Sequence, residues 1–344
     1  MKTTLISIIS DQTIPNVLFL KEVGKNADQF VFLTTESMED KGKSEAVRIA
    51  CGLEESRIIR IVIEEDKLAL IKKTLYENNF SLTPGTQFLI NITGGTKLMS
   101  LAVYEYFRNL NSTFYYLPIG KNKVQKIESH FNEVTLPLNY RLSLREYLEA
   151  CGLTYEQKNL FNFTEKQTSE LFEDYRKTRF DFDTFPIEKA TRMSVFPVTI
   201  ENIRGTWFEE FVYYQVKRQL DIPDYMIGSS VMVFKDSEIQ YNDNEFDVMF
   251  VRDNELFVIE CKVHLSGGNQ KLKLDTALNK LGAITKNFGL KTKSYLFTLS
   301  NLRNYRGKFS DVLIRKCEVL GVEVPVDGVF FTNGSKLLEI FKAL

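Results

Sequence analysis

Apolar runs alternate with amphipathic stretches along the first third of the chain. Five short runs have the length and composition of buried strands: LISIIS, QFVFLTT, RIIRIVI, QFLINIT and TFYYLPI. The segments between them carry apolar residues at helical spacing. Because strands that alternate with helices form parallel sheets, residues 3–117 predict a mainly parallel α/β sheet. Residues 125–138 predict a hairpin at its edge, and residues 142–150 predict a closing helix.

The remainder of the chain has a different order of elements. Residues 153–200 are polar and aromatic, with helical patches and no strong strand, which predicts a helical connector. After Gly205 comes the helix TWFEEFVYYQVKRQL, then the strands MIGSSVMVF, EFDVMFV and LFVIECK, a further helix, and the strand SYLFTLS. This order predicts a second α/β core. We therefore expect a first domain at 1–149, a connector at 150–202 and a second domain at 203–344.

Length and charge agree with two ordinary folded domains. The 344 residues exceed one typical domain, and 44 Lys and Arg nearly balance 45 Asp and Glu. This balance excludes a polycationic scaffold and an acidic disordered tail. No apolar run reaches the roughly 18 residues of a membrane span, and the first run is too short for a signal peptide. We expect a cytoplasmic protein that does not contact membranes.

Cysteine and histidine are too sparse and too scattered for most metal sites. The four cysteines are far apart and form no CxxC pair, so neither a zinc ribbon nor a disulfide framework is indicated. They are Cys51, Cys151, Cys261 and Cys317. The only histidines, His130 and His264, leave two candidate bases for a Ser-His-Asp triad and exclude His-rich sites. Carboxylates and lysines must carry any chemistry.

Three acids and a lysine lie in two strands that a two-residue turn predicts to pair. Asp and Asn at 253–254 both tolerate the positive φ of such a turn. With that turn, Asp247 faces Glu260 and Glu245 faces Lys262. Strand alternation then puts all four side chains on one face, among apolar neighbours. Two carboxylates are directly opposite each other.

Two like charges directly opposite each other destabilise a sheet. The pair of carboxylates therefore favours a bound cation between them. Oxygen ligands without Cys or His favour Mg²⁺ or Mn²⁺. Lys262 could orient a water molecule or neutralise developing charge on a phosphate, which predicts a phosphodiesterase-like site. Two other interpretations stay open: a solvent-facing hairpin whose acids never meet, and an exposed Glu245–Lys262 ion pair.

The same residues resemble a known nuclease motif. Asp247 followed by the Glu-Cys-Lys run at 260–262 is similar to the D…(D/E)xK core of restriction-endonuclease-like nucleases. Phe246 stands where that family usually has proline. The resemblance implies that Asp247 and Glu260 are catalytic residues and metal ligands, with Lys262 as the catalytic lysine.

In similar nucleases a glutamate on the first core helix completes the metal site. GTWFEE resembles that element, so Glu209 is implied as the third catalytic acid and metal ligand, with Glu210 as the fallback. Thr206-x-x-Glu209 also fits a capping box, so Glu209 has a second interpretation as a helix cap. Glu210 could equally be surface charge. Lys280 and His264 could face the same groove, or be a solvated lysine and an ordinary strand-end histidine.

Charge around the motif favours a phosphate-rich partner. Between residues 262 and 316 the chain has twelve Lys and Arg against Asp275 and Asp311 alone. Such a local excess predicts a face that binds the phosphates of a nucleic acid. Neutralisation by acids from elsewhere in the fold is the alternative.

Gly94 and Gly95 follow the fourth predicted strand, QFLINIT, and stand just before the predicted helix LMSLAVYEYFRNL. Free backbone N–H groups at a helix N-terminus attract anions, and Thr96 and Lys97 could add contacts. Neither a P-loop nor a dinucleotide fingerprint is present, and Gly-Gly is also an ordinary turn. Loops after the first and fifth strands should meet it at the same edge of the sheet, where such folds bind ligands. The candidate ligand-binding residues are Ser10, Asp11, Gln12, Thr13, Thr93, Gly94, Gly95, Thr96, Lys97, Gly120 and Lys121.

NITGGTK and SDQTIPN together resemble the CARF domain, the CRISPR-associated Rossmann fold that senses cyclic oligoadenylates. With the nuclease core, residues 1–149 and 203–300 resemble the CRISPR-associated ancillary nucleases of type III systems. The resemblance implies a homodimer that holds one cyclic tetra-adenylate on its twofold axis. It also implies that this ligand switches on a metal-dependent nuclease.

The predicted function is therefore a phosphodiesterase of antiviral defence that cyclic tetra-adenylate activates. It would use Mn²⁺ or Mg²⁺ to nick or degrade DNA, with single-stranded RNA as a further candidate substrate. Two alternatives stay open. A ligand-responsive DNA-binding regulator would carry a winged helix-turn-helix in place of the acidic hairpin. A ring nuclease would degrade the cyclic activator in the first domain, with Thr96 and Lys97 stabilising the transition state.

Overall fold

The computed structural model describes residues 2–80, 85–127, 133–158, 160–235, 244–265, 270–289, 292–332 and 339. It divides the chain into two units. The first contains Met1–Thr154 with Gly289–Lys291, and the second contains Tyr155–Phe288 with Thr292–Leu344. His130 lies outside the described residues. No helix in the described ranges is long and apolar enough to cross a membrane.

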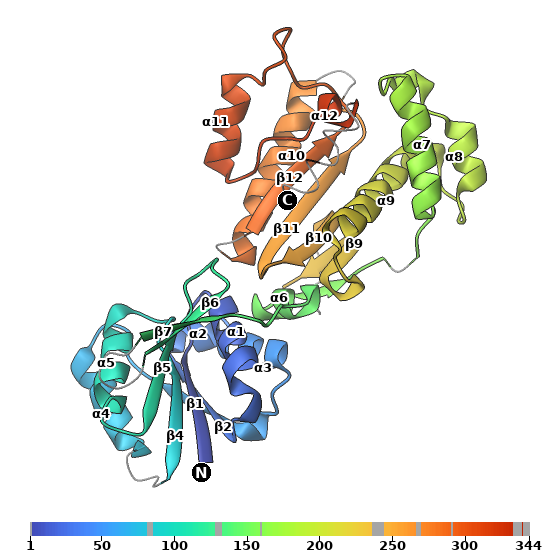
Figure 1. Cartoon of the computed structure of the whole chain (residues 1–344). Helices are drawn as coiled ribbons and strands as arrows, with labels where there is room; N and C mark the ends of the chain where they lie inside the picture. Colours follow the sequence, from blue (N-terminus) through green and yellow to red (C-terminus); the bar gives the residue numbers. More distant parts are fainter. Residues whose placement is uncertain are drawn as a thin grey trace. The chain divides into compact units, whose positions relative to one another are not determined.

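The first unit is built on a seven-stranded sheet with the order β3-β2-β1-β4-β5-β6-β7 (Figure 1). Its parallel strands are β1 (Lys2–Ile8), β2 (Gln29–Thr34), β3 (Ile58–Val62), β4 (Thr86–Asn91) and β5 (Ser112–Tyr116). The antiparallel pair β6 (Lys123–Ile127) and β7 (Glu133–Pro137) forms the edge. All five predicted strands and the predicted hairpin are confirmed.

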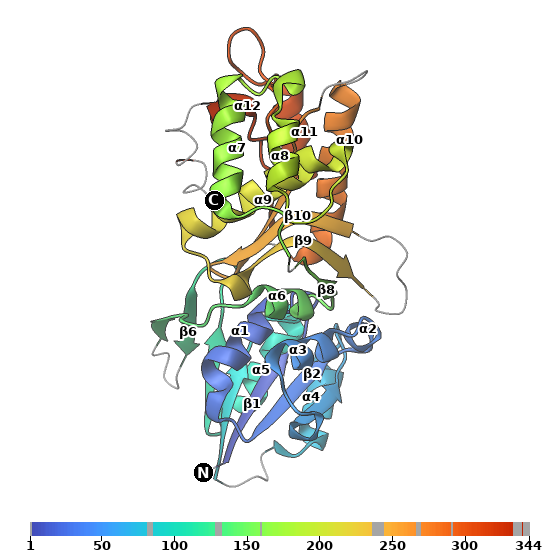
Figure 2. The ribbon, with the colours of Figure 1, turned by 90° about the vertical axis from the view of Figure 1, so that its right-hand side faces the viewer.

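Helices cover both faces of this sheet, as Figures 1 and 2 show. α4 (Leu68–Glu77) packs with α5 (Lys97–Phe107), while α3 (Lys43–Cys51) packs with α1 (Ile14–Val23) and α6 (Leu144–Ala150). The short α2 (Glu36–Asp40) precedes α3. Because the chain runs outward from β1 in both directions, the neighbouring β1 and β4 form a topological switch point. Ligand loops are expected there.

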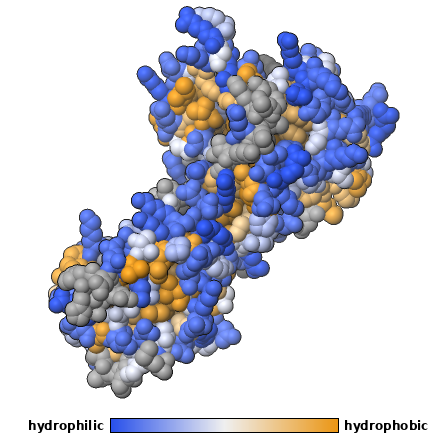
Figure 3. Space-filling view, in the orientation of Figure 1, coloured by the Kyte–Doolittle hydropathy of each residue, from blue (hydrophilic) through white to orange (hydrophobic). Residues whose placement is uncertain are grey.

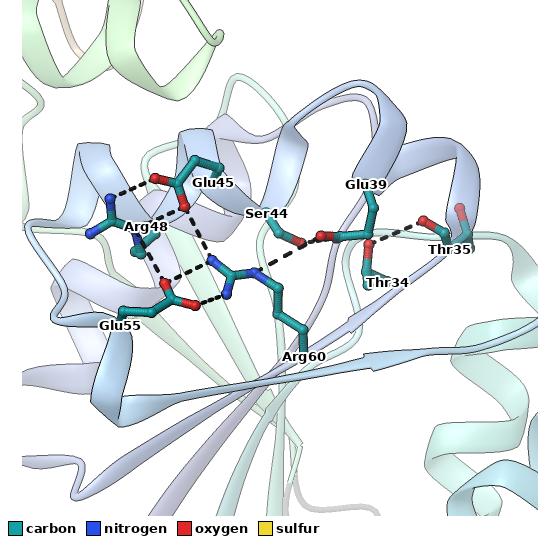
Figure 4. A network of polar contacts seen from close by, with 8 residues as sticks. All are labelled: Thr34, Thr35, Glu39, Ser44, Glu45, Arg48, Glu55 and Arg60. Carbon is teal, nitrogen blue, oxygen red and sulfur yellow. Dashed lines mark hydrogen bonds and ion pairs between the residues drawn. The ribbon is translucent and has the colours of Figure 1, made fainter.

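One exposed ion network ties α3 to the outer strand β3 in this unit (Figure 4). Arg60 on β3 contacts Glu55 and places Nη2 3.2 Å from Glu45 Oε2. Arg48 pairs with the same two acids, at 2.5 Å from Glu45 and 3.5 Å from Glu55. Glu39 reaches Arg60 at 3.9 Å. Because these ion pairs are exposed to solvent, each contributes little to the stability of the unit.

The second unit has a five-stranded mixed sheet with the order β12-β11-β10-β9-β8. Its strands are β8 (Thr154–Glu156), β9 (Ile227–Phe234), β10 (Asn244–Arg252), β11 (Glu255–Lys262) and β12 (Thr292–Thr298). β9, β10 and β11 are antiparallel neighbours, and β12 runs parallel to β11. The predicted strands from 226 onward are therefore confirmed.

A long helix, α9 (Ile200–Leu220), contributes many side chains to the core of this unit. Trp207, Phe208 and Phe211 are buried against Val248 and Ile259 of the sheet. The helix α10 (Gln270–Ile284) packs on β12 and also contacts α11 (Asp311–Leu320). The short α12 (Gly328–Thr332) completes the unit.

The helical connector predicted at 150–202 contains α7 (Glu165–Lys177) and α8 (Ile187–Met193). Both pack on α9 and lie inside the second unit. Leu171, Phe172 and Tyr175 add apolar area to its core. This segment is therefore part of the scaffold that holds the second sheet.

Candidate functional site

The β10–β11 hairpin has the predicted register. Asp253 and Asn254 adopt positive φ, 52° and 64°, as a two-residue turn requires. Opposite residues of β10 and β11 pair from Arg252↔Glu255 to Val248↔Ile259, so Asp247 and Glu260 are the next residues on each strand. Asp247 Oδ2 accepts a hydrogen bond from the backbone N–H of Cys261 at 2.5 Å. The turn therefore brings the two acids together.

These two carboxylates are buried and share one ammonium group. Asp247 and Glu260 are 8% and 3% exposed. Lys262 Nζ lies 2.7 Å from Glu260 Oε1 and 3.8 Å from Asp247 Oδ2. The interpretation of a solvent-facing hairpin whose acids never meet is therefore wrong. Glu245 is exposed, and in the described part of the chain Lys262 pairs with Glu260 and Asp247 instead of with Glu245.

Burial and mutual repulsion make this site electrostatically unfavourable without a further cation. Desolvation raises the pKa of Asp247 well above its usual range, and the charges of Glu260 and Glu209 raise it further. Burial lowers the pKa of Lys262, but the attraction of Asp247 and Glu260 outweighs it and the net shift is upward. Lys262 is thus an ammonium ion at neutral pH. Besides Lys262, a second ammonium group lies near the acids, since Lys280 Nζ is 3.6 Å from Glu260 Oε2.

Glu209 projects from the interior of α9 toward this cluster. Burial raises its pKa to about 7, Lys262 opposes the shift, and Glu245 and Glu260 add to it. A Cβ at Gly205, one turn earlier, would lie 3.5 Å from Glu209 Oε1, which is an ordinary van der Waals contact. The capping interpretation is wrong, because α9 begins at Ile200 with Thr199 as its N-cap.

Glu210 has a structural role instead. It is 1% exposed, and its Oε1 accepts hydrogen bonds from Lys158 Nζ and the backbone N–H of Asn162, both at 2.9 Å. Its Oε2 accepts one from the N–H of Phe163 at 2.8 Å. All these partners precede α7 in the same unit. The interpretation of Glu210 as surface charge is wrong, and its oxygens are already satisfied, which leaves Glu209 as the candidate third acid.

The acid pair fits a divalent ion that completes its coordination with water and substrate. Within the described ranges, no three His, Cys, Asp or Glu side chains converge closely enough to hold a metal by themselves. The predicted set of Asp247, Glu260 and Glu209 is therefore not assembled as three direct ligands in this conformation. Within the described residues, Glu260 Oε2 is buried and accepts no hydrogen bond, and the nearby cation is Lys280 Nζ at 3.6 Å. Mg²⁺ is commonly held by only one or two carboxylates.

A pocket of about 340 Å³ opens beside these residues. Lys273, Thr276 and Lys280 line it from one face of α10, since they are spaced three and four residues apart. Lys280 Nζ lies 3.6 Å from Glu260 Oε2 and 3.3 Å from the carbonyl oxygen of Glu245. Lys280 is therefore an exposed helix lysine, 41% accessible, that also faces the groove. Sequence reasoning did not single out Lys273 and Thr276, although their helical spacing from Lys280 was a usable signal.

His264 lines the same pocket. Its Nε2 lies 2.6 Å from the hydroxyl of the buried Tyr175 on α7. Desolvation lowers its pKa, so the imidazole is neutral at physiological pH. The histidine is both a strand-end residue held by a core tyrosine and part of the pocket wall.

In the first unit, the loop after β4 packs tightly on the end of β1. A Cβ at Gly94 would lie 2.4 Å from the carbonyl oxygen of Ile8, closer than any side chain tolerates. Gly95 has φ +76° and approaches the Ile8 side chain. Glycine is required at both positions, and the packing brings loop 93–97 beside loop 9–13 at the switch point. Gly95, Thr96 and Lys97 are exposed there.

The other predicted ligand-binding residues divide into exposed and structural ones. Thr93 Oγ1 accepts a hydrogen bond from the N–H of Leu117, which ties this loop to the loop of Gly120 and Lys121, both exposed. Thr13 is buried and donates its hydroxyl to the carbonyl of Ala150. Its side chain therefore braces α6.

Two further bonds brace the same edge. Thr96 caps α5 by accepting from Met99 N–H, and it donates to the carbonyl of Glu65 at 2.7 Å. Exposed Asp11 pairs with Lys41 at 3.1 Å, and Ser10 donates to the carbonyl of Gln12 at 3.2 Å. These loops form a braced rim with backbone N–H groups and Lys97 at its exposed part.

Both units match models of one protein family. The Card1 CARF domain model matches residues 4–147, and the model of the Card1-like endonuclease domain matches residues 199–317. The chain belongs to the Card1 family. Its first unit is thus a CARF domain with a mostly parallel sheet, and its second is an endonuclease domain, as the sequence resemblance implied. No curated protein matches the chain.

Solved structures share the fold over the whole chain. Protein VC1899 from Vibrio cholerae is 17% identical, with a TM-score of 0.72 over 99% of this chain and 98% of that one. Can2 from Sulfobacillus thermosulfidooxidans, solved with cyclic tetra-adenylate, is 19% identical, with a TM-score of 0.72 over 98% and 99%. A type III CRISPR defence DNA nuclease activated by cyclic oligoadenylate is 16% identical, with a TM-score of 0.56 over 92% and 52%. At these identities the likeness establishes the fold alone.

In the endonuclease domain, Glu209→Gln should raise the thermal stability of the metal-free protein near pH 8 and have little effect near pH 5. The folded-state pKa of about 7 lies above the ordinary 4.5, so the protonated acid stabilises the fold at low pH. That contribution disappears as the pH rises through 7. Glutamine removes the cost of the buried charge, worth about 1–3 kcal/mol. Differential scanning calorimetry of the variant and the wild type at both pH values measures this difference in thermal stability.

The neighbouring variant Glu210→Gln is the matched control. It should destabilise the protein at both pH values, since it removes a carboxylate that accepts from two backbone N–H groups and a lysine. An equal effect of Glu209→Gln at the two pH values would contradict the assigned burial of its charge.

Proposed function

We propose that the chain is an endonuclease of type III CRISPR defence that a cyclic oligoadenylate, specifically cyclic tetra-adenylate, activates. Its substrate is DNA, which it nicks or degrades with Mn²⁺ or Mg²⁺, and single-stranded RNA is a second substrate. Membership of the Card1 family, with a CARF domain and an endonuclease domain, supports the proposal. Two structures of similar fold also support it, one bound to cyclic tetra-adenylate and one a DNA nuclease that cyclic oligoadenylate activates.

The observation that carries the catalytic part is the buried pair Asp247 and Glu260 with Lys262 between them. A divalent ion held by the two carboxylates would supply Lewis-acid activation of water and of the scissile phosphate. Glu260 Oε2, which lies 3.6 Å from Lys280 Nζ and accepts no hydrogen bond within the described residues, would be a ligand of that ion. Lys262 keeps its proton and donates to the phosphate oxygen on which negative charge grows.

Other pocket residues hold the substrate. Lys273 and Lys280 on α10 face the same cavity as Lys262, and ammonium groups there attract the backbone phosphates on either side of the cleaved bond. Glu209, at the edge of the acid pair, adds negative charge that tightens binding of the divalent ion.

For the activator, the exposed backbone N–H of Gly95 and the ammonium groups of Lys97 and Lys121 supply donors to phosphates. A homodimer is proposed because a ring of four nucleotides has a twofold axis that two identical rims can share. Apolar groups on the CARF surface, orange in Figure 3, suit such a contact. The large apolar side chains exposed around α5 and the β5–β7 edge are Leu98, Leu101, Tyr116, Ile119, Val134 and Leu136.

The alternative of a DNA-binding regulator required a winged helix-turn-helix in place of the acidic hairpin. The β10–β11 hairpin with its buried acids occupies that part of the chain, which favours the nuclease. For the ring nuclease, the Thr96 hydroxyl already donates to the carbonyl of Glu65, so it would have to leave that bond to act on the activator.

One assay tests the proposal. Supercoiled plasmid and labelled single-stranded RNA are incubated separately with the protein and Mn²⁺, with and without cyclic tetra-adenylate. We expect cleavage only with the activator, and the two substrates report which polymer is cut. Cleavage without activator would refute the switch, and no cleavage despite tight activator binding would refute the nuclease.

A further inference from the structure

The segment between β12 and α11 projects from the endonuclease domain as a narrow loop (Figures 1 and 2). Tyr305 in this loop is 90% exposed, more than any other large hydrophobic side chain in the described ranges. Residues 300–310 contain Arg303, Arg306 and Lys308 and no acid. An aromatic ring held in water beside cations is typical of surfaces that bind single-stranded nucleic acid.

Hydrogen bonds fix the conformation of this loop. Asn304 Oδ1 accepts from the N–H groups of Arg306 at 2.9 Å and Lys308 at 3.2 Å. Asn304 N–H donates to the Lys308 carbonyl at 2.9 Å, and Gly307 N–H donates to the Asn304 carbonyl at the same distance. Gly307 supplies the positive φ of +72° that the turn needs. The tip is therefore shaped before any ligand arrives.

Arg303 anchors the base of the loop. Its Nε lies 3.1 Å from the fully buried carboxylate of Asp327, and its Nη1 donates to the Gly307 carbonyl. The guanidinium lies over the rings of Phe309 and Phe330, 4.6 and 4.4 Å from their centroids. With Arg303 used in this way, Arg306 and Lys308 are the charges left at the tip.

Arg306 positions the exposed ring. Its Nε donates to the Tyr305 hydroxyl at 2.9 Å, and its guanidinium lies 5.2 Å from the ring centroid. The end of this projection is hydrophilic in Figure 3. A rigid ring next to a guanidinium can stack on a base while the cation binds the adjoining phosphate.

The loop starts at the wall of the catalytic pocket. β12 runs parallel to β11 with Thr298 opposite Lys262, so both strands end at the same edge. Leu299 N–H donates to the carbonyl of Val263, and Leu265 N–H donates to Ser300 Oγ at 2.9 Å. Leu265 lines the pocket. Tyr305 is five residues beyond Ser300, so it lies at most about 17 Å from it.

We propose that residues 303–308 form a substrate-binding loop in which Tyr305 stacks on an unpaired base and Arg306 and Lys308 bind the flanking phosphates. The reach of about 17 Å from Ser300 corresponds to roughly five stacked nucleotides, at about 3.4 Å each, between Tyr305 and the pocket wall. The partner is a single-stranded or locally melted stretch of the nucleic acid. This inference rests on the proposed nuclease function and names how that substrate is held.

The test uses the full chain with cyclic tetra-adenylate, without a divalent metal, and a single-stranded oligodeoxynucleotide of about 20 nucleotides that carries 2-aminopurine. Stacking of the probe on Tyr305 should quench its emission. Tyr305→Ala should raise the Kd about tenfold and abolish the quench, whereas Tyr305→Phe should keep most of both. With Mn²⁺, Tyr305→Ala should raise KM and leave kcat within about twofold, because the loop binds without touching the reacting atoms.

The matched control is Tyr225→Ala, since Tyr225 is 63% exposed in the same domain but follows an acid, Asp224. It should bind like the wild type. Arg306→Gln is a second variant. It should reduce the slope of the logarithm of the binding constant against the logarithm of the salt concentration by about one, the value of one phosphate contact.

If the wild-type protein cuts nucleic acid and Tyr305→Ala keeps the same Kd and the same quench, the loop assignment alone is overturned. A wild type that neither binds nor cuts any nucleic acid would overturn the proposed function itself.

Discussion

Asp247→Asn and Glu260→Gln should each reduce activated nucleic-acid cleavage by at least about 10³-fold. Each substitution removes one of the two buried carboxylates that Lys262 Nζ approaches within 3.8 and 2.7 Å, respectively. The amides keep the shape of the side chain but not the charge that a divalent ion needs. Initial rates of plasmid cleavage at saturating activator and Mn²⁺ measure the loss.

Both variants should bind cyclic tetra-adenylate as the wild type does, which calorimetric titration checks. Glu255→Gln is the matched control on the same strand, because its carboxylate pairs with Lys293 at 3.3 Å at the other end of β11. It should retain wild-type cleavage. Full cleavage in both Asp247→Asn and Glu260→Gln would refute the assigned catalytic centre.

Gly94→Ala should strongly weaken the response of cleavage to the activator. The new Cβ would lie 2.4 Å from the carbonyl oxygen of Ile8, and backbone cannot turn aside as a flexible side chain can. Loop 93–97 must therefore move away from the end of β1, and the rim of N–H groups loses its shape. We expect the Kd for cyclic tetra-adenylate to rise at least about tenfold, with cleavage falling accordingly.

Gly24→Ala in the same unit separates this effect from a general loss of stability. Its Cβ would meet only side-chain carbons of Leu5 and Phe30, at 3.0 and 3.3 Å, and both can shift. That variant should bind the activator normally. Equal Kd values for Gly94→Ala and the wild type would show that loop 93–97 does not hold the ligand.

Local signals explain why the hairpin could be predicted from the sequence. The turn residues Asp253 and Asn254 fix the register, and the alternation of β10 and β11 fixes the faces, so the meeting of Asp247 and Glu260 follows from adjacent residues. The five strands of the CARF domain were predictable for the same reason, since each is a short apolar run between turn signals.

Long-range contacts explain what was missed. Thr206-x-x-Glu209 has the pattern of a cap, but α9 starts at Ile200, after the N-cap Thr199, and continues through Gly205 because Ile203 and Trp207 are both buried in the core. The hydrogen bonds of Glu210 reach residues 47 and 48 positions away, beyond any sequence periodicity. No local pattern separates the two adjacent glutamates.

Tyr305 was missed for a different reason. Aromatic residues are counted as core candidates, and its exposure depends on the Asn304 turn and the Arg303–Asp327 anchor 24 positions away. The absence of acids over 300–310 was the available sign.

The two-residue turn of the β10–β11 hairpin also bears on how the protein folds. Hairpins with such short loops close in about 1–10 μs, whereas contacts between distant segments carry a larger loop-closure cost and form later. Asp247 and Glu260 therefore meet by a local event, and Glu209, 38 and 51 positions earlier, joins them only when α9 docks on the sheet. The repulsion between these two acids is therefore present as soon as the hairpin closes, with Lys262 on the same hairpin as their first counter-ion.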